Sequence, residues 1–500
     1  MSKINLGEKS PFIYQCSSYD INKYEFFCEN INLEDYEFFD KRILTKREGK
    51  TSIEKFCDVV VPEICKSNKA KELLIKRNSL NNILTNVLKC SEKGKVCAIR
   101  RDKNYYSIPS KYKIPYFNYE TTIGLIDKLI SLNYLSEKKG YYDKELSAGK
   151  ITRIWASIEL IEDLNNPIFA EDSVRLRKMK TEAGTIYFGQ IESKISTPYP
   201  TNIILKDTDK FLVDYPLTQK VKRLTNFLKD YNKLLSHHFI LCPFNHETPF
   251  QSKIILNNTI LSYNQPNHNY SYNVEHNTTS PLLIQNQSNL LIYKELSDRL
   301  IRVFNRSSFS LGGRFYGGSY QQLNSEKRSE ILIDFEAVTE VDFSSLHINM
   351  LYNLLGYDYK GDPYLVMGER LRPLMKLVSL ISINAKSMTS GIKAFNDELN
   401  KNQSLKELHK SSGLKSREYF LRFAEQHSRI NKFLNSDIGL TLQYKDSMIA
   451  EDILKHFTKK GIPCLPIHDS FIVSAKFRDE LTNVMKEVYS KHFGFIPKLK

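Results

Sequence analysis

Residues 330–356 read EILIDFEAVTEVDFSSLHINMLYNLLG, and this segment constrains the architecture of the chain more than any other. Its first half is apolar and strand-like and ends at Asp342. Its second half repeats apolar residues at helical spacing, among them Leu346, Met350 and Leu351. The pattern predicts a strand followed by a helix, with Asp342 where the strand ends. A carboxylate in that place is well positioned to hold a metal ion.

A second carboxylate lies in IPCLPIHDSFIVSA, residues 462–475. Two apolar runs flank His468 and Asp469, which indicates a strand, a tight turn and a strand, with Asp469 on the turn. Phosphoryl transfer uses two Mg²⁺ ions about 3.5–4 Å apart, and two aspartates can bridge both ions. Because Mg²⁺ keeps several waters, two carboxylates are enough, and Mn²⁺ is an alternative ion. Single aspartates at strand ends are common, so the pair needs further support.

That support comes from LRPLMKLVSLISINAKS, residues 371–387. Arg372 and Lys376 are four residues apart and share one face of a predicted helix, Asn384 follows about two turns later, and Pro373 suits the first turn. Such a face can bind a triphosphate, because Arg forks onto its oxygens and Lys offers a point charge. The alternative is an ordinary solvated helix face.

Together these segments resemble the family A DNA polymerases and the single-subunit phage RNA polymerases. VDFSSLHINMLY resembles motif A, RPLMKLVSLISINA motif B and IHDSFIV motif C, and the three occur in the family's order. LQYKDSMIAEDILKHFTKKGIPCLPIHD also resembles the helix before motif C. The resemblance extends from about Gly312 to Lys500. It implies an α+β fold, a polymerase palm with helical fingers.

The resemblance also implies roles for individual residues. Asp342 and Asp469 become the metal ligands, with the Phe343 carbonyl as a further ligand. Arg372, Lys376, Asn384 and His347 become nucleotide-binding residues, and Lys376 also neutralises or protonates the leaving pyrophosphate. His468 is placed near the primer terminus, and Gln443 faces the primer–template.

Three departures leave the sugar of the product open. His347 stands where the DNA polymerases carry a glutamate that helps to exclude ribonucleotides, and Asn384 stands where they carry a tyrosine. Ser470 follows the His-Asp pair, as in the RNA polymerases, where many DNA polymerases have a second acid. The sequence therefore does not decide between dNTPs and NTPs.

A glycine-rich segment, SLGGRFYGGSYQQL, precedes motif A at residues 310–323. It is expected to form a loop in which the backbone approaches a phosphate and aromatic rings stack on bases. Arg314 and Tyr316 are its candidate contacts with template or primer. The alternative is a plain turn.

An upstream region, residues 67–165, has the order helix, helix, basic hairpin. The helices are expected within 71–89 and 121–135, and KITRIWASIEL is expected to be the returning strand of the hairpin. This order predicts a winged-helix-like, nucleic-acid-binding domain. Its candidate phosphate contacts are Lys138, Lys139, Lys150 and Arg153. A protein-docking role is the alternative.

The chain is therefore divided into five segments. They are an N-terminal segment of unknown role (1–66), the winged-helix-like domain (67–165), a connecting or thumb-like region (166–250), an Asn-rich loop (251–289) and the palm and fingers (290–500).

Composition agrees with a polyanionic partner. The 500 residues contain 72 Lys and Arg against 57 Asp and Glu, a formal charge of +15, which favours phosphate neutralisation. Expected partners are nucleic acid, as a primer–template duplex or a single strand, and nucleoside triphosphates. The eight cysteines form no CxxC pair, so reduced thiols are expected. No apolar run is long enough for a membrane span and the first residues lack a secretory signal, so a cytoplasmic location is expected.

The sequence thus predicts a nucleotidyltransferase that extends a nucleic-acid strand by a two-metal mechanism. Two alternatives remain open. One is a nucleic-acid-binding protein resembling a replication initiator, whose polymerase-like part is inactive. The other is a nucleotidyltransferase that works without a template.

Overall fold

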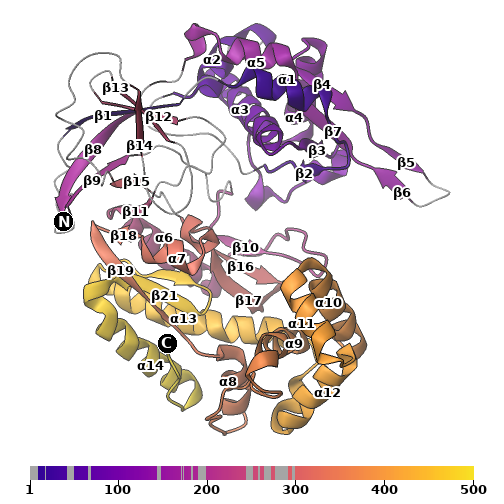
Figure 1. Ribbon diagram of the computed structural model, residues 1–500, viewed down its shortest axis with the longest axis vertical. Coiled ribbons are helices and arrows are strands. Elements are labelled where there is room, and N and C mark those ends of the chain that lie inside the picture. Colours follow the sequence, from indigo (N-terminus) through magenta and orange to yellow (C-terminus); the bar gives the residue numbers. More distant parts are fainter. Residues whose placement is uncertain are drawn as a thin grey trace. The chain divides into compact units, whose positions relative to one another are not determined.

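The computed structural model in Figure 1 shows a mixed α and β chain that divides into two compact units. The first unit comprises Met1–Thr201, Ser236–Arg299 and Gln322–Phe335, and the second Asn202–Leu235, Leu300–Gln321 and Glu336–Lys500. The structure describes residues 9–16, 19–41, 50–65, 69–143, 148–170, 172, 174–181, 184–189, 199–243, 252–256, 259–263, 272–275, 291–295 and 299–500.

The helices of the first unit include the two predicted from apolar spacing. These two are α3 and α4, and on α3 the side chains of Leu80, Ile83, Leu84 and Val87 are fully buried. The helical spacing of these four residues explains why α3 forms and which face it buries. The helices are α1 (Ile21–Glu29), α2 (Ser52–Ile64), α3 (Ala70–Glu92), α4 (Tyr119–Ser131), α5 (Ile158–Leu164) and α7 (Ser325–Ser329).

A four-stranded sheet packs with α3 and α4. Its order is β2-β3-β7-β4, with β2 (Tyr36–Phe38), β3 (Val96–Ile99), β4 (Leu135–Lys138) and β7 (Thr152–Ala156). Strands β4 and β7 are antiparallel, so the returning strand expected near residue 152 is present. A separate pair of strands, β5 (Tyr141–Asp143) and β6 (Ala148–Lys150), lies between them in sequence.

The remaining strands of the first unit are hydrogen-bonded in the order β14-β13-β12-β1-β8-β9-β15-β11-β18. They are β1 (Lys9–Cys16), β8 (Val174–Thr181), β9 (Gly184–Gly189), β11 (Ile240–Pro243), β12 (Ser252–Leu256), β13 (Thr259–Tyr263), β14 (Tyr272–Glu275), β15 (Leu291–Glu295) and β18 (Leu332–Ile333).

The prediction of a loop over 251–289 is wrong where β12, β13 and β14 lie. Strands β12 and β13 pair antiparallel, with Ile254 opposite Leu261. The apolar, β-branched runs KIIL and TILSY within the Asn-rich stretch favour strands, and the prediction gave them too little weight.

The second unit contains the predicted motifs A, B and C. Its helices are α6 (Gln219–Leu235), α8 (Leu346–Asn353), α9 (Arg372–Asn384), α10 (Met388–Lys401), α11 (Gln403–Ser412), α12 (Ser416–Gln426), α13 (Gly439–Lys460) and α14 (Arg478–Phe493). Its strands are β10 (Ile203–Leu205), β16 (Ile301–Asn305), β17 (Ser308–Tyr316), β19 (Glu336–Asp342), β20 (Leu465–Ile467) and β21 (Ser470–Ser474).

Two small sheets and a helical cluster build this unit. Strand β21 lies between β19 and β20, antiparallel to both, and β16 lies between β10 and β17. Helix α13 packs on β17, α6 and α14. Helices α9 to α12 gather around the buried rings of Phe395, Tyr419 and Phe420 and form the orange cluster in Figure 1.

The first half of the glycine-rich segment expected as a loop, residues 310–316, is strand, since β17 spans Ser308–Tyr316. Gly313 has φ +82°, and a Cβ there would lie 2.7 Å from the Phe304 ring and 2.9 Å from the Ser447 hydroxyl. Only glycine allows β17 to approach both the neighbouring strand and α13 so closely. The glycines therefore serve packing within the sheet at this point.

A buried ion pair joins β16 to α13. The Arg302 side chain is fully buried, forms an ion pair with Glu451, and donates to the Ser447 hydroxyl at 3.0 Å and the Gly313 carbonyl at 2.7 Å. Its guanidinium also lies 4.8 Å from the centre of the Phe315 ring. Every polar group of this arginine thus has a partner inside the core.

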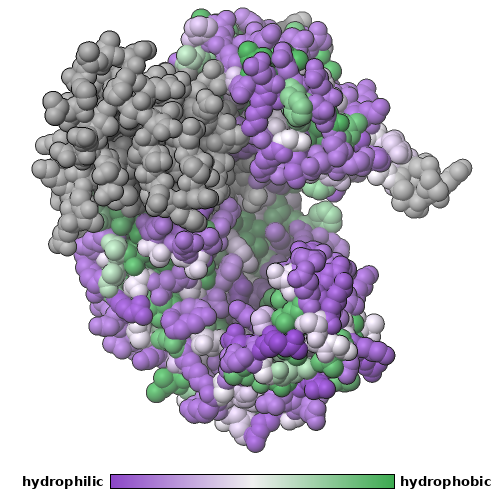
Figure 2. Space-filling view, viewed as in Figure 1, coloured by the Kyte–Doolittle hydropathy of each residue, from purple (hydrophilic) through white to green (hydrophobic). Residues whose placement is uncertain are grey.

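In the described part of the chain, no helix combines the length and the apolarity that crossing a bilayer requires. The face seen in Figure 2 is mostly hydrophilic where it is coloured, with apolar residues in small groups.

We expect Arg302→Met to lower the free energy of unfolding by about 3–5 kcal/mol, because Glu451 would keep a buried charge without its main partner. Urea denaturation followed by circular dichroism measures this loss. Arg302→Met combined with Glu451→Leu should lose less than the single variant, since no charge is then buried. The exposed Arg223→Met serves as a control and should be neutral. A single-variant loss no greater than that of Arg223→Met would contradict the structural importance of the pair.

Candidate active site

The pairing of β19 with β21 brings the two predicted metal ligands together. Asp342, the last residue of β19, lies opposite Ser470, and the Phe343 amide donates to the Asp469 carbonyl at 3.1 Å. Asp342 and Asp469 are both half-buried, and the Phe343 side chain is buried. Residues 127 positions apart in sequence therefore share one site, where they can act as a pair.

The turn that carries Asp469 has an unusual backbone. Ile467 and Ser470 pair across it, and His468 has φ 55°, in the left-handed region. Histidine adopts this region more readily than most residues but still with some strain. The His468 side chain is exposed, and its ring centre lies 5.7 Å from that of Tyr316. Partial desolvation and, secondarily, the positive charge of Arg314 lower the pKa of His468 from its ordinary value.

A third segment borders the aspartates. Lys500 and Asp342 exchange backbone hydrogen bonds of 2.9 and 3.0 Å, and the Ser344 amide donates to the Lys498 carbonyl at 2.8 Å. The Lys500 ammonium lies 2.8 Å from Asp342 Oδ2. Leu499 thus forms an isolated antiparallel bridge with Phe343, and this pairing places the Lys500 cation on the proposed metal ligand.

The electrostatics of Asp342 favour a bound cation. Burial raises the pKa of the Asp342 carboxyl, the Lys500 hydrogen bond opposes this rise, and the negative charge of Asp469 adds to it. Asp342 Oδ1 is buried without a hydrogen-bond partner. A buried carboxylate oxygen beside a second acid suits a divalent cation. Within the described residues, no group of three or more His, Cys, Asp or Glu side chains is arranged for a metal, so this donor set is two aspartates.

A polar cluster lies between β17, α8 and α13. Asp446 is almost fully buried; Arg314 donates to Asp446 Oδ2 from Nε at 3.0 Å and from a terminal nitrogen at 2.5 Å, and His347 Nε2 lies 2.8 Å from the same oxygen. Asp446 therefore fixes the positions of Arg314 and His347. Both predicted ligand-binding side chains are held by the protein itself.

Helix α9 presents the predicted triphosphate-binding face. Arg372 Nε donates to Asp362 at 2.7 Å, and its guanidinium lies 5.3 Å from the centre of the Tyr364 ring. Lys376, one turn later, is exposed and has no ion-pair partner in the described part of the chain. Lys376 is therefore free to meet an anion, whereas Arg372 must share its charge with Asp362.

The end of α9 packs tightly against the start of α13. Asn384 is exposed and donates to the Leu380 carbonyl at 2.8 Å, and a Cβ at Gly439 would lie 2.0 Å from its side-chain oxygen. Gln443, one turn into α13, is half-buried. Motif B and the helix before motif C are thus in direct contact here.

The predicted phosphate contacts of the first unit differ in accessibility. Lys138 and Lys139 are exposed, and Lys139 lies 3.7 Å from Glu137. Lys150 pairs with Glu34. Arg153 is only 4% exposed and donates to the Ile151 carbonyl at 2.6 Å, which does not suit the predicted contact from an exposed wing.

Four residues near the site were missed from the sequence: Asp362, Tyr364, Asp446 and Lys500. Asp446 had a detectable signal, because it follows Leu442 by four residues and precedes Ala450 by four, on the apolar face of its helix. A carboxylate on an apolar face needs a buried partner. No comparable signal marks Lys500, whose role comes from strand pairing alone.

Comparisons with known proteins give little information about the function of this chain. No family model and no curated protein matches the chain. Among solved structures, the chain is similar to the POL domain of Pol1 from M. smegmatis in complex with DNA primer-template and dNTP, with 12% identity and a TM-score of 0.27. The match covers 41% of this chain and 47% of that one, so it spans about half the length of the solved chain. With a likeness this weak, the case for function rests on the residues themselves.

The raised pKa of Asp342 predicts that this residue destabilises the fold at neutral pH. Stability should fall as pH rises from the ordinary carboxyl pKa of 3.8 through the higher pKa of the folded state. We expect Asp342→Asn to raise Tm at pH 7 by about 2–4 °C, the shift that 1 kcal/mol produces in a unit of this size. The gain should shrink as pH is lowered toward 4.

Thermal unfolding followed by circular dichroism at several pH values measures this effect. The matched control is Asp209→Asn, which removes an exposed carboxylate from the same unit and should leave Tm unchanged. A lower Tm for Asp342→Asn at pH 7 would show that the ion pair with Lys500 outweighs burial and the charge of Asp469.

Proposed function

We propose that the chain is a nucleotidyltransferase that extends a nucleic-acid strand by a two-metal mechanism, with template-directed polymerisation as its reaction. One observation carries this proposal. The two aspartates of the predicted motifs A and C are adjacent, and one of their carboxylate oxygens is buried without a partner. The palm and fingers, and the winged-helix-like character of residues 67–165, are part of the same proposal.

Asp342 and Asp469 would hold the metal ions, with the Phe343 carbonyl as a further oxygen. When bound, Mg²⁺ supplies activation of a 3′-hydroxyl and neutralisation of triphosphate charge. The protein contributes rigidity, because β19 and β21 fix both carboxylates through backbone hydrogen bonds. Burial and, secondarily, repulsion from Asp469 raise the pKa of Asp342, and positive charge between the two carboxylates would relieve that repulsion.

Helix α9 would bind the triphosphate. Lys376 is exposed and has no carboxylate partner among the residues that the structure describes, so it is the residue proposed to neutralise or protonate the leaving pyrophosphate. Arg372 would add a second cation on the same helix face after exchanging Asp362 for phosphate oxygens. His347 and Asn384 would contact the sugar and base, and the choice between dNTP and NTP depends on them.

The nucleic acid would run past β17, α13 and the turn before β21. His468 and Tyr316, whose rings are neighbours, would lie at the primer terminus. Gln443 and Arg314 would face the primer–template. In the first unit, the exposed Lys138 and Lys139 would contact phosphates.

One observation favours the alternative of an inactive polymerase-like unit in a nucleic-acid-binding protein. The Lys500 ammonium already lies on Asp342 Oδ2 and neutralises part of its charge without any metal. A scaffold that had lost catalysis would be stabilised by such a contact. The alternative predicts tight nucleic-acid binding with no incorporation.

A primer-extension assay tests the proposal. A labelled primer–template is incubated with Mg²⁺ and either dNTPs or NTPs, and the products are separated by size. We expect Asp342→Asn and Asp469→Asn each to reduce extension at least about a thousandfold, the scale of losing a central catalytic group. Asp209→Asn should retain full activity, and EDTA should abolish it.

The outcomes separate the alternatives. Extension that follows the template sequence supports a polymerase, and the accepted nucleotide identifies its sugar. Addition without regard to template supports the template-independent enzyme. Binding without incorporation of any nucleotide would overturn the proposal in favour of the binding protein.

The contact between Lys500 and Asp342 predicts competition with the metal. We expect Lys500→Met to lower the Mg²⁺ concentration for half-maximal extension about fivefold, because an exposed ion pair contributes on the order of 1 kcal/mol. A magnesium titration of the extension rate measures this. Lys498→Met removes the same charge from the same segment, where the Lys498 ammonium contacts the Gly361 and Lys360 carbonyls and interacts with Asp362, and should leave the titration unchanged. An unchanged midpoint for Lys500→Met would contradict competition.

A further inference from the structure

The first unit contains a concave site far in sequence from the predicted catalytic residues. It has a volume of about 930 Å³ and lies where β2, the end of β3 and the β5–β6 pair meet. This volume lies within the range of about 300–1,000 Å³ that is usual for ligand clefts. All of its lining residues belong to the first unit.

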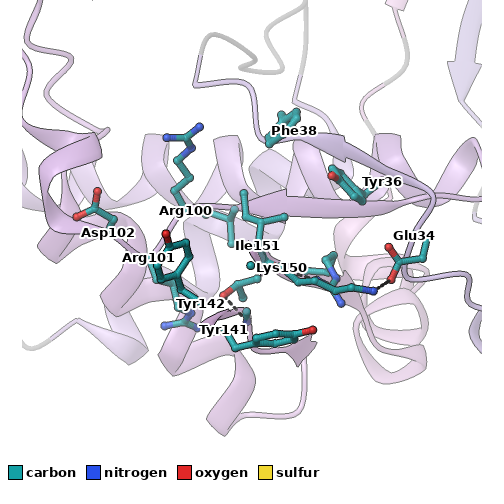
Figure 3. Close-up of a pocket in the computed structure, with 15 residues that line it drawn as sticks. Glu34, Tyr36, Phe38, Arg100, Arg101, Asp102, Tyr141, Tyr142, Lys150 and Ile151 are labelled. Carbon is teal, nitrogen blue, oxygen red and sulfur yellow. Dashed lines mark hydrogen bonds and ion pairs between the residues drawn. The ribbon is translucent and has the colours of Figure 1, made fainter. Parts of the chain in front are cut away.

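Aromatic side chains stand exposed on both sides of this pocket. Figure 3 shows Tyr36 and Phe38 on one side and Tyr141 and Tyr142 on the other. Phe38, Tyr141 and Tyr142 are 63%, 63% and 67% exposed, and Tyr36 is 37% exposed. Large rings are rarely left so open in a hollow unless a partner covers them. Two pairs of rings on separate elements offer stacking surfaces for more than one planar group.

Positive charge accompanies the rings. The pocket is lined by Arg100, Arg101, Lys150 and Arg153, against two carboxylates, Glu34 and Asp102. Arg101 is committed to Asp127 and Glu137, and Lys150 to Glu34. The Arg100 guanidinium is exposed and lies over the Tyr105 ring at 5.2 Å, with no carboxylate partner in the described residues.

Arg153 is a buried polar residue among those that line the pocket. Register across the sheet aligns Phe38 with Ala98, Ala98 with Arg153, and Arg153 with Lys138. Ala98 has a small side chain. The row of paired residues is therefore lowest at Ala98, with the Phe38 ring on one side and the cationic side chains of Arg153 and Lys138 on the other. Arg153 is 4% exposed, and its Nε has no hydrogen-bond partner. An unsatisfied buried donor of this kind is costly unless a ligand or water meets it.

Close packing keeps the β5–β6 pair in shape. A Cβ at Gly149 would lie 2.6 Å from the Tyr141 carbonyl, and one at Gly140 would lie 2.3 Å from the Lys150 carbonyl. Any larger residue would push the two strands apart. The glycines thus hold Tyr141 and Tyr142 at the rim.

We propose that this pocket binds unpaired bases of a single-stranded nucleic acid. The rings of Tyr36, Phe38, Tyr141 and Tyr142 stack on bases, and Arg100, whose guanidinium has no carboxylate partner in the described residues, contacts the backbone phosphates. Combined aromatic rings and cations are the surface that single strands recognise. A duplex offers no free base faces to these rings. The inference does not depend on the polymerase chemistry, because the site lies in the other unit.

Fluorescence anisotropy of the full chain in EDTA tests the proposal. The probes are fluorescein-labelled oligothymidylate and oligouridylate of about twelve nucleotides, a length within the usual site size. We expect Tyr36→Ala/Phe38→Ala and Tyr141→Ala/Tyr142→Ala each to weaken binding at least about tenfold, given a stacking contribution of about 1–3 kcal/mol per base. Comparison of the two probes distinguishes DNA from RNA.

Two controls isolate stacking. Phe26→Ala removes a 68% exposed ring elsewhere in the same unit and should not alter affinity. An abasic strand of equal charge should bind weakly to the parent chain and lose little in the double variants. Tm values of all variants establish that they are folded, and Tyr141→Phe/Tyr142→Phe should keep full affinity.

Several results would overturn the inference. The first two are that the double variants lose affinity equally for the abasic and the natural strand, or equally for a duplex and a single strand. The third is that a free dNTP competes as effectively as the oligonucleotide. The fourth is that no folded double variant changes the affinity. The last result would leave the pocket as a protein-docking surface. Because EDTA removes the metal, failure here says nothing against the polymerase, and a failed extension assay says nothing against this pocket.

Discussion

The antiparallel register of β19 and β21 is the constraint on which the candidate active site depends. It sets Asp342 opposite Ser470 and so beside Asp469. Because side chains alternate along a strand, a slip of one residue would turn Asp342 to the other face of the sheet. Buried apolar residues oppose such a slip, since Val341 and Phe471 pair in the same register and are both almost fully buried. Core packing therefore fixes the position of a polar site.

Helix α13 fixes the rest of the second unit in a different way. It carries two buried carboxylates, Asp446 and Glu451, whose partners Arg314 and Arg302 come from β17 and β16. An unpaired buried charge costs several kcal/mol, so sliding the helix along the sheet would lose both pairs at once. Apolar contacts alone tolerate small shifts more easily. The charged pairs thus specify one position of α13, and His347 is oriented through the same carboxylate.

The sequence predicted the parts of the site whose information is local. The apolar run ending at Asp342, the turn at His468 and Asp469, and the amphipathic face of α9 all follow from spacing within one segment. Lys500 could not be found in this way, because only its pairing with motif A brings it to Asp342. The glycines of β17 were misread as a loop, since local composition does not reveal that α13 packs against Gly313. A prediction made from one segment at a time contains no information about which distant segments pair with it.

The charge balance at Asp342 links stability to function. Burial and the neighbouring Asp469 both oppose its ionisation, yet the role proposed for it as a metal ligand requires the ionised form. A protein keeps such a group only if something compensates it, and among the described residues the exposed side chain of Lys500 forms an ion pair with Asp342. An exposed lysine is a weak and movable partner, because water competes for its ammonium. A divalent cation is a stronger partner for two adjacent carboxylates than one exposed ammonium. Lys500 therefore stabilises the Asp342 carboxylate and still leaves it available to such a cation.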